Sequence, residues 1–161
     1  LFHASRNATA SFNWSATPQS ASLSWDSYPR LDTDYYSAST DQVHIMESGD
    51  YKIAYGVSWY QTGAGAMVTG SLKTYIATSS FAAGSGSAAN TSSIGTLANS
   101  LNYARIEGPE GGASRGSNSA AFMASLNTND VLRLYVEHDY GHVPATSSTV
   151  AGQAWIIIEK V

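Results

Sequence analysis

The sequence contains no cysteine, so no disulfide bond can hold the chain together. Its 161 residues suffice for one domain. A domain of that size buries roughly 68–70% of its unfolded surface and needs no covalent cross-link. The lack of cysteine fits a cytosolic, phage or bacterial source, but it excludes no compartment.

Charged residues are also scarce, at 12% of the chain, and the net charge is −4. No run of lysine or arginine occurs, so binding to nucleic-acid phosphates is not expected. No apolar run approaches the roughly 20 residues that a membrane-spanning helix needs. The first residues lack the basic and apolar regions of a signal peptide. We therefore expect no nucleic-acid partner and no insertion into a membrane.

Alternation of large and small residues is the main pattern that the chain does contain. Between positions 51 and 59 every second residue is large and apolar or aromatic, namely Tyr51, Ile53, Tyr55, Val57 and Trp59. The residues between them are small or polar, which predicts a strand with one face in a core. The small face suggests close covering by another strand or subunit, or a narrow solvated surface.

Similar patterns predict further strands along the whole chain, separated by turn residues. They are expected at residues 11–15, 21–25, 43–47, 66–78, 102–106, 120–126, 131–137 and 151–159. Two stretches rich in glycine and serine, residues 79–96 and 107–119, are expected to be long loops. Together these features predict an all-β sandwich or barrel of short strands. Residues 1–161 are expected to form a single domain that begins with an N-terminal arm of about residues 1–10.

Three patterns in this order resemble the C1q/TNF-like superfamily of trimeric jelly rolls. The first is Gly49-Asp50-Tyr51-Lys52-Ile53-Ala54-Tyr55, a glycine turn followed by an aromatic strand. The second is a strand that ends at Leu126, a turn that ends in Asp130, and an apolar strand after it. Asn129 stands where the family has glycine, and asparagine also adopts the left-handed conformation. The third is the last strand, with small residues before Trp155-Ile156-Ile157-Ile158.

This resemblance implies an all-β, jelly-roll β-sandwich of about eight to ten antiparallel strands that forms a homotrimer around a three-fold axis. No cofactor is expected. The proposed trimer-interface residues are Tyr55, Trp59, Tyr103 and Tyr135, because tyrosine and tryptophan are enriched at protein interfaces. The alternative is that each of these side chains fills the core of its own subunit.

The motifs that could indicate a metal site or an active site are weak. His138-Asp139-Tyr140-Gly141-His142 has zinc-ligand residue types, but a surface loop is the favoured interpretation. The acidic segment Asp26–Asp41 lacks the continuation of a calcium loop, and a solvated loop is favoured there too. No Gly-x-Ser-x-Gly elbow occurs in a strand–turn–helix context. We therefore expect neither a metal site nor an enzyme.

Two functions fit these features. The first is a structural protein of a virion surface, such as a phage capsid decoration or tail-associated protein, which contacts the major capsid protein. The alternative is a receptor- or glycan-binding head of a fibre or a C1q-like adhesin, which contacts a host-surface glycan. Both place the protein on a virion surface or outside the cell. The proposed ligand-binding residues are Tyr28, Tyr35, Tyr36 and Tyr140.

Overall fold

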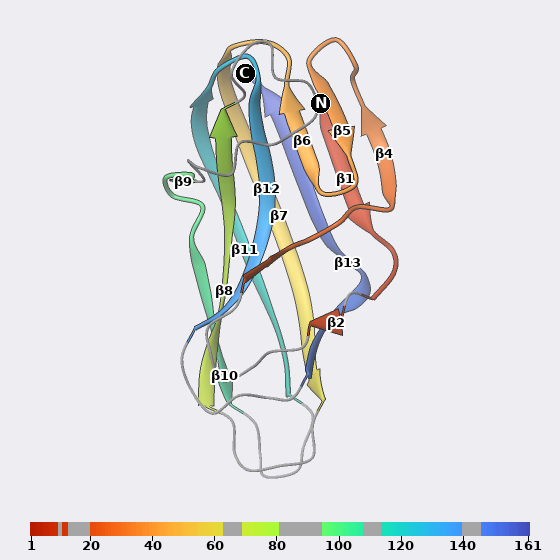
Figure 1. Cartoon of the computed structure of the whole chain (residues 1–161), viewed down its shortest axis with the longest axis vertical. Helices are drawn as coiled ribbons and strands as arrows, with labels where there is room; N and C mark the ends of the chain where they lie inside the picture. Colours follow the sequence, from red (N-terminus) through yellow and green to blue (C-terminus); the bar gives the residue numbers. More distant parts are fainter. Residues whose placement is uncertain (10, 13–19, 63–68, 81–94, 108–113, 140–145) are drawn as a thin grey trace.

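A computed structural model describes residues 1–9, 11–12, 20–62, 69–80, 95–107, 114–139 and 146–161. These residues form strands and no helix, and the strands build two antiparallel sheets. Both sheets run along the long axis of the molecule, and both chain termini lie at the same end (Figure 1). The expected all-β jelly-roll sandwich is confirmed.

The first sheet contains six strands. Their order is β11 (Ser114–Leu126), β7 (Gly49–Thr62), β13 (Thr146–Lys160), β1 (Phe2–Arg6) and β4 (Ser27–Leu31), with β2 (Ser11–Phe12) also paired to β13. The first and last strands of the chain are therefore neighbours, from the pair Phe2 and Ile158 to the pair Arg6 and Ala154.

The second sheet contains seven strands. Their order is β10 (Asn102–Glu107), β8 (Thr69–Ser80), β12 (Asp130–Asp139), β6 (Gln42–Ile45) and β5 (Tyr36–Ser39), with β3 (Ser20–Ser22) on β12 and β9 (Gly95–Thr96) on β8. In both sheets most neighbours are distant in sequence, so long-range pairing rather than a series of hairpins makes the fold.

The core lies between the two sheets and follows the alternation in the sequence. The large residues of β7, from Tyr51 to Trp59, are each at most 3% exposed. The second sheet contributes Leu132, Leu134 and Val136 of β12, which are also buried. Burying a side chain of this size stabilises a fold by about 1.5–3 kcal/mol, so these strands supply much of the driving force for folding.

Three segments differ from the sequence-based expectation. Residues 2–6 of the expected arm form β1 inside the first sheet, where Phe2 and Ala4 are fully buried. Residues 114–119 of the second expected loop belong to β11, because they pair with β7 over its whole length. Strands β4 and β5 were not expected within the acidic segment. Strands β1, β4 and β5 are only four or five residues long, and residues 114–119 are small or polar apart from Arg115, so their patterns are weak without their neighbours.

The turn between β11 and β12 has the expected chemistry. Asn129 has a φ of 73°, which confirms that asparagine takes the left-handed conformation there. The Asp130 carboxylate accepts a hydrogen bond from the backbone N–H of Asn127 at 2.9 Å. This turn brings the ends of the two sheets together at the end that carries the termini.

Candidate interaction surface

Two of the four proposed interface residues lie in the core of their own subunit. Tyr55 is fully buried, and its hydroxyl donates to the backbone oxygens of Ser100 at 2.6 Å and of Thr74 at 3.0 Å. Burial raises the pKa of Tyr55, so the hydroxyl stays protonated and can donate. Trp59 is 3% exposed. For both residues the core alternative describes their position.

Asn118 is a buried polar residue that the sequence analysis missed. It comes from β11, and its side-chain oxygen accepts a hydrogen bond from Trp59 Nε1 at 3.1 Å. Its amide nitrogen donates to the Leu72 carbonyl of β8 at 2.9 Å, so it joins the two sheets. We call this contact between Asn118, Trp59 and Leu72 the sheet bridge. A lone asparagine in a stretch rich in glycine and serine gives no signal of such a role.

The other two proposed interface residues reach the outer face of the second sheet. Tyr103 of β10 is 53% exposed. Tyr135 of β12 is half-buried and stacks on Tyr75 of β8, with ring centres 5.5 Å apart. Tyr75 donates to Glu137, which also pairs with Lys73 at 3.0 Å. Among these residues Tyr103 presents the largest free aromatic surface.

The proposed ligand-binding tyrosines are dispersed. Tyr36 is 1% exposed, and burial raises its pKa to about 12. Tyr28 is 37% exposed and donates to the backbone oxygen of Ser39 at 3.1 Å. Tyr35 is half-buried beneath the Lys160 ammonium, which lies 5.5 Å from its ring centre. Tyr140 lies outside the described residues.

The outward face of the first sheet has two rows without Asp, Glu, Lys or Arg between β1 and β11, while Lys52 and Glu159 lie in the adjacent row and Arg30 lies on β4. Its residues form transverse rows in register across the strands. One row contains His3, Ile157, Ala54 and Ala121, and the next contains Ser5, Trp155, Gly56 and Ser119. We call these eight residues the open face. A Cβ on Gly56 would lie 2.7 Å from Trp155 Nε1, so the indole of the same chain covers this glycine.

Strand β11 is the edge of the first sheet beside the open face, and β10 of the second sheet runs along it, with the Asn102 amide donating to the Ser119 backbone oxygen. Among the described residues its backbone ladder is formed with β7 alone, and after Arg115 its residues 116–126 contain neither charge nor proline. The other edge strands are protected: β4 contains Pro29 and Arg30, β5 is short, and β10 contains Arg105 and Glu107. A long neutral edge of this kind offers unpaired backbone groups and invites contact with another chain.

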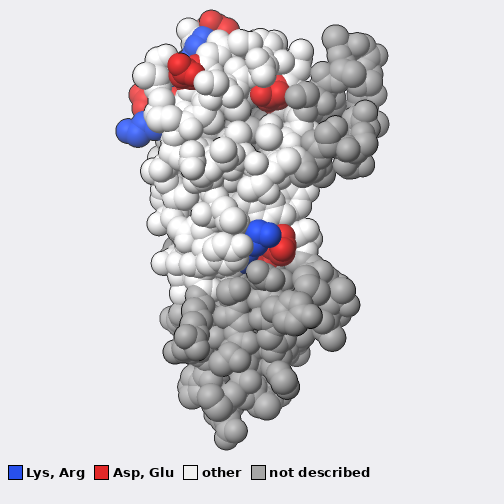
Figure 2. Space-filling view, turned by 90° about the vertical axis from the view of Figure 1, so that its left-hand side faces the viewer, with Lys and Arg blue, Asp and Glu red and all other residues white. Residues whose placement is uncertain are grey.

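Apolar side chains are also exposed at and near the edge that β10 and β11 form, but on different faces of the sandwich: Tyr103 lies on the outer face of the second sheet and Met123 on that of the first. The exposed side chains are Leu101, Tyr103 and Met123, with exposed fractions of 43%, 53% and 52%. Figure 2 shows the left-hand side of Figure 1, where charges gather near the upper end and a pair of opposite charges lies just above the residues drawn in grey. The open face adjoins the β11 edge, because Ser119 and Ala121 belong to both.

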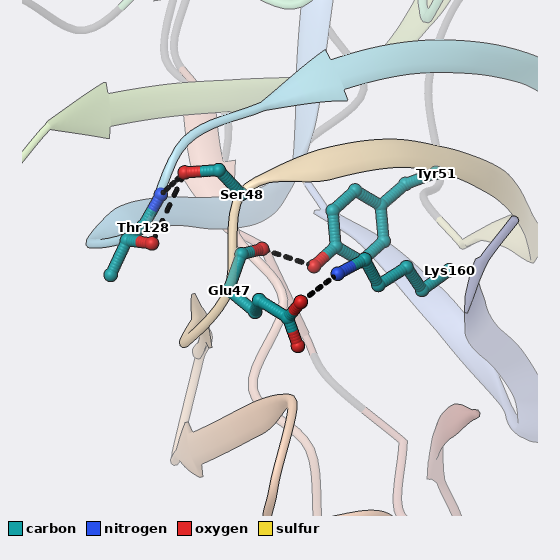
Figure 3. A network of polar contacts seen from close by, with 5 residues as sticks. All are labelled: Glu47, Ser48, Tyr51, Thr128 and Lys160. Atoms are coloured by element: carbon teal, nitrogen blue, oxygen red, sulfur yellow. Dashed lines mark hydrogen bonds and ion pairs between the residues drawn. The ribbon is translucent and has the colours of Figure 1, made fainter.

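The end that carries the termini is instead polar and internally paired (Figure 3). Glu47 binds Lys160 at 2.5 Å, and its backbone oxygen accepts a hydrogen bond from the Tyr51 hydroxyl. The hydrogen bond with Glu47 raises the pKa of Lys160. Ser48 accepts from the Thr128 N–H at 2.9 Å. These contacts tie the β6–β7 turn to the end of β13 and to the β11–β12 turn.

Asp26 and Asp41, two carboxylates of the acidic segment, each interact with different partners. Asp26 accepts from the N–H groups of Asn7 and Ala8 at 2.7 and 2.9 Å. Asp41 accepts from Ser22 at 2.9 Å and lies 3.6 Å from Arg133. Among the described residues no three His, Asp or Glu side chains gather where they could hold a metal ion. Nor does the part of the chain that the structure describes include a helix long and apolar enough to span a membrane.

Comparison with known proteins gives no match to any family model or curated protein sequence. Solved structures do match. Murine APRIL at pH 5.0 superposes with a TM-score of 0.60 at 13% identity, covering 99% of this chain and 97% of that one. Eiger TNF from S. frugiperda gives a TM-score of 0.60 at 13% identity, covering 99% and 90%.

The chain has a TNF-like jelly-roll fold. This likeness covers nearly the whole chain, whereas the three sequence patterns of the resemblance begin only at Gly49. The TNF-like fold therefore includes β1, which the sequence analysis had assigned to an arm. At 13% identity the match establishes the fold, and no residue role is transferred from it.

Proposed function

We propose that this chain is a non-catalytic, self-assembling structural module that forms a homotrimer. The observation that carries the proposal is the open face together with the neutral edge of β11. A soluble protein rarely leaves a long, uncharged edge strand beside an apolar face without a covering partner. A second copy of the chain fits because neither surface carries like charges that would repel their own kind.

The expected contact involves the exposed residues rather than the buried aromatic ones. Tyr103 and Met123 each present about half of their side chain to solvent in the single chain, whereas Tyr55 and Trp59 are buried. Of the proposed interface residues, Tyr103 is the most exposed; it lies on the outer face of the second sheet, on the strand next to the β11 edge. Ile157 and Trp155 supply the large apolar groups of the open face, and aromatic and aliphatic anchors dominate interface energies.

The test is the mass of the native particle, measured by light scattering coupled to size exclusion. The wild type should have the mass of three chains. Ala121→Glu should yield a folded monomer, because burying a carboxylate in the interface would cost more free energy than association releases. Ala121 is exposed in the single chain, so this substitution should leave the fold itself intact.

The matched control is Ser37→Glu. Ser37 is an exposed residue of β5, on the edge of the second sheet and away from the open face. This variant should keep the mass of three chains. A wild type with the mass of one chain at working concentrations would overturn the proposal.

The setting that we propose for this trimer is a virion surface, as a capsid decoration or tail-associated protein in contact with the major capsid protein. The scarcity of charge and the absence of cysteine suit a rigid shell component. Quantitative mass spectrometry of purified virions tests this setting. A decoration protein should be present in hundreds of copies per particle, and absence from the particles would exclude the virion role.

The competing proposal is a receptor- or glycan-binding head outside the cell. Partial exposure of Tyr28 and Tyr35 favours it, because aromatic rings at a surface can stack on a ligand. Both rings also have contacts within the chain, which makes this proposal the weaker one. A glycan-array screen of the assembled protein, repeated with Tyr35→Ala, separates the two functions.

A further inference from the structure

His3 is an ionisable side chain set within the row of apolar residues on the open face. It lies on β1 and is half-buried in the single chain. Its register partner on β13 is Ile157, and the row continues through Ala54 of β7 to Ala121 of β11. Directly opposite residues on neighbouring strands bring their Cβ atoms to about 4.5–5.5 Å, so His3 contacts the apolar row laterally.

Charged groups of both signs surround His3. Asp32, which follows β4, lies 4.0 Å from the nitrogen of Leu1, the outward neighbour of His3 along the chain. On β4 its register partner is Arg30, which is exposed. On β13 the next outward residue beyond Ile157 is Glu159, which pairs with Lys52 of β7 across the adjacent row. On β1 itself the next outward residue is Ser5, which is uncharged. The nearest charged residue in the row of His3 is therefore a cation.

We propose that His3 acts as a pH-dependent gate on self-association, so that the homotrimer assembles when His3 is neutral and weakens when His3 is protonated. This inference rests on the proposed function, because it concerns the same open face. Histidine is the side chain whose charge ordinarily changes between about pH 5 and pH 8, so the gate would operate in a physiological range.

The physical reason is the environment that a second subunit would create. Covering the open face removes water from His3 and leaves the imidazole between Ile157 and Arg30. Burying a charged group in an apolar contact is costly, and the guanidinium of Arg30 repels an imidazolium. A neutral imidazole carries no charge to bury and is not repelled by the guanidinium of Arg30. Association therefore releases protons, and acid opposes it by mass action.

The experiment is sedimentation equilibrium of the full chain at about pH 7.5 and about pH 5.5, with the fold checked by near-ultraviolet circular dichroism. The wild-type dissociation constant should rise about tenfold or more in acid, since each tenfold change corresponds to one unit of differential proton affinity. His3→Gln, which stays neutral, should associate with the same constant at both pH values.

His44→Gln is the matched control, because His44 lies on β6 in the other sheet. This variant should keep the wild-type pH response. A wild type that stays trimeric with an unchanged constant at both pH values would overturn the gate but leave the homotrimer standing. A response that persists in His3→Gln would also overturn it. A monomer at both pH values would remove the proposed function and the gate together.

Discussion

At the scale of single residues, Gly56 and Trp155 account for the small face of β7. The sequence left open whether another strand, another subunit or solvent lies against this face. The structure places the Trp155 indole there, because the two residues are register partners on β7 and β13. The three nearest atoms to a Cβ on Gly56 would all belong to that indole, at 2.7 to 2.9 Å.

Gly56→Val should therefore lower the free energy of unfolding by about 1–3 kcal/mol, because it forces the indole away from the sheet. Denaturant unfolding followed by circular dichroism measures the change. Gly95→Val is the control, since a Cβ on Gly95 meets no atom within 4 Å. Equal stabilities for the two variants would show that Trp155 moves aside at no cost.

At the scale of strands, the sheet bridge fixes the side of the sandwich where β10 and β11 run together. Two edge strands from different sheets meet there. Backbone pairing cannot join the two sheets across the core, so side chains must do so. Asn118 contacts β7 through Trp59 and β8 through Leu72, and Tyr55 contacts β8 through Thr74. Polar groups buried together in this way fix the relative position of the sheets.

Asn118→Ala should lower the free energy of unfolding by about 1–3 kcal/mol, because it leaves the Trp59 N–H and the Leu72 carbonyl buried without this partner. Urea titration monitored by tryptophan fluorescence measures the loss. Ser117→Ala, at the exposed neighbouring position of β11, should change stability little. A loss as large in Ser117→Ala would point to a general weakness of β11 instead of the sheet bridge.

The contact between β6 and β12 should make stability depend on pH. Burial lowers the pKa of His44, and the nearby Arg133 lowers it further. The unfolded chain then binds a proton more readily than the folded chain. Stability is retained above the ordinary histidine value of 6.5 and is lost as pH falls below it.

Unfolding free energies at several pH values between about 7.5 and 5 measure this dependence. The wild type should lose stability progressively across that range. His44→Gln should show a smaller loss, because it removes the group that the unfolded state protonates preferentially. Identical pH profiles for the two proteins would exclude His44 as the cause.

At the scale of the whole molecule, polar and apolar surfaces are separated. Charges pair with one another near the end that carries both termini, where Lys160 binds Glu47 (Figures 1 and 3). The open face and the β11 edge extend along the sides of the strands. The TNF-like fold therefore leaves a surface suited to self-association, and the termini lie at one end of it.

Much of the fold could be predicted from the sequence where the residues are large. The aromatic alternation of β7 and the apolar residues of β12 and β13 predicted strands that the structure confirms. Strand β1 was not predicted because five residues are too few for a clear alternation, and the first part of β11 was not predicted because serine, glycine and asparagine give weak patterns. The candidate surface was only partly predictable: Tyr55 and Tyr103 are both strand tyrosines, yet one is buried and the other is exposed.

The sequence by itself determined the all-β class and the left-handed turn at Asn129, because these depend on local alternation and on the conformation of single residues, while the jelly-roll arrangement was an expectation from the resemblance. Only the tertiary structure decided which aromatic side chains fill the core and which face remains open. It also revealed the sheet bridge and the neutral edge of β11. Those features arise from strands that are far apart in sequence and adjacent in space, so no local pattern can encode them.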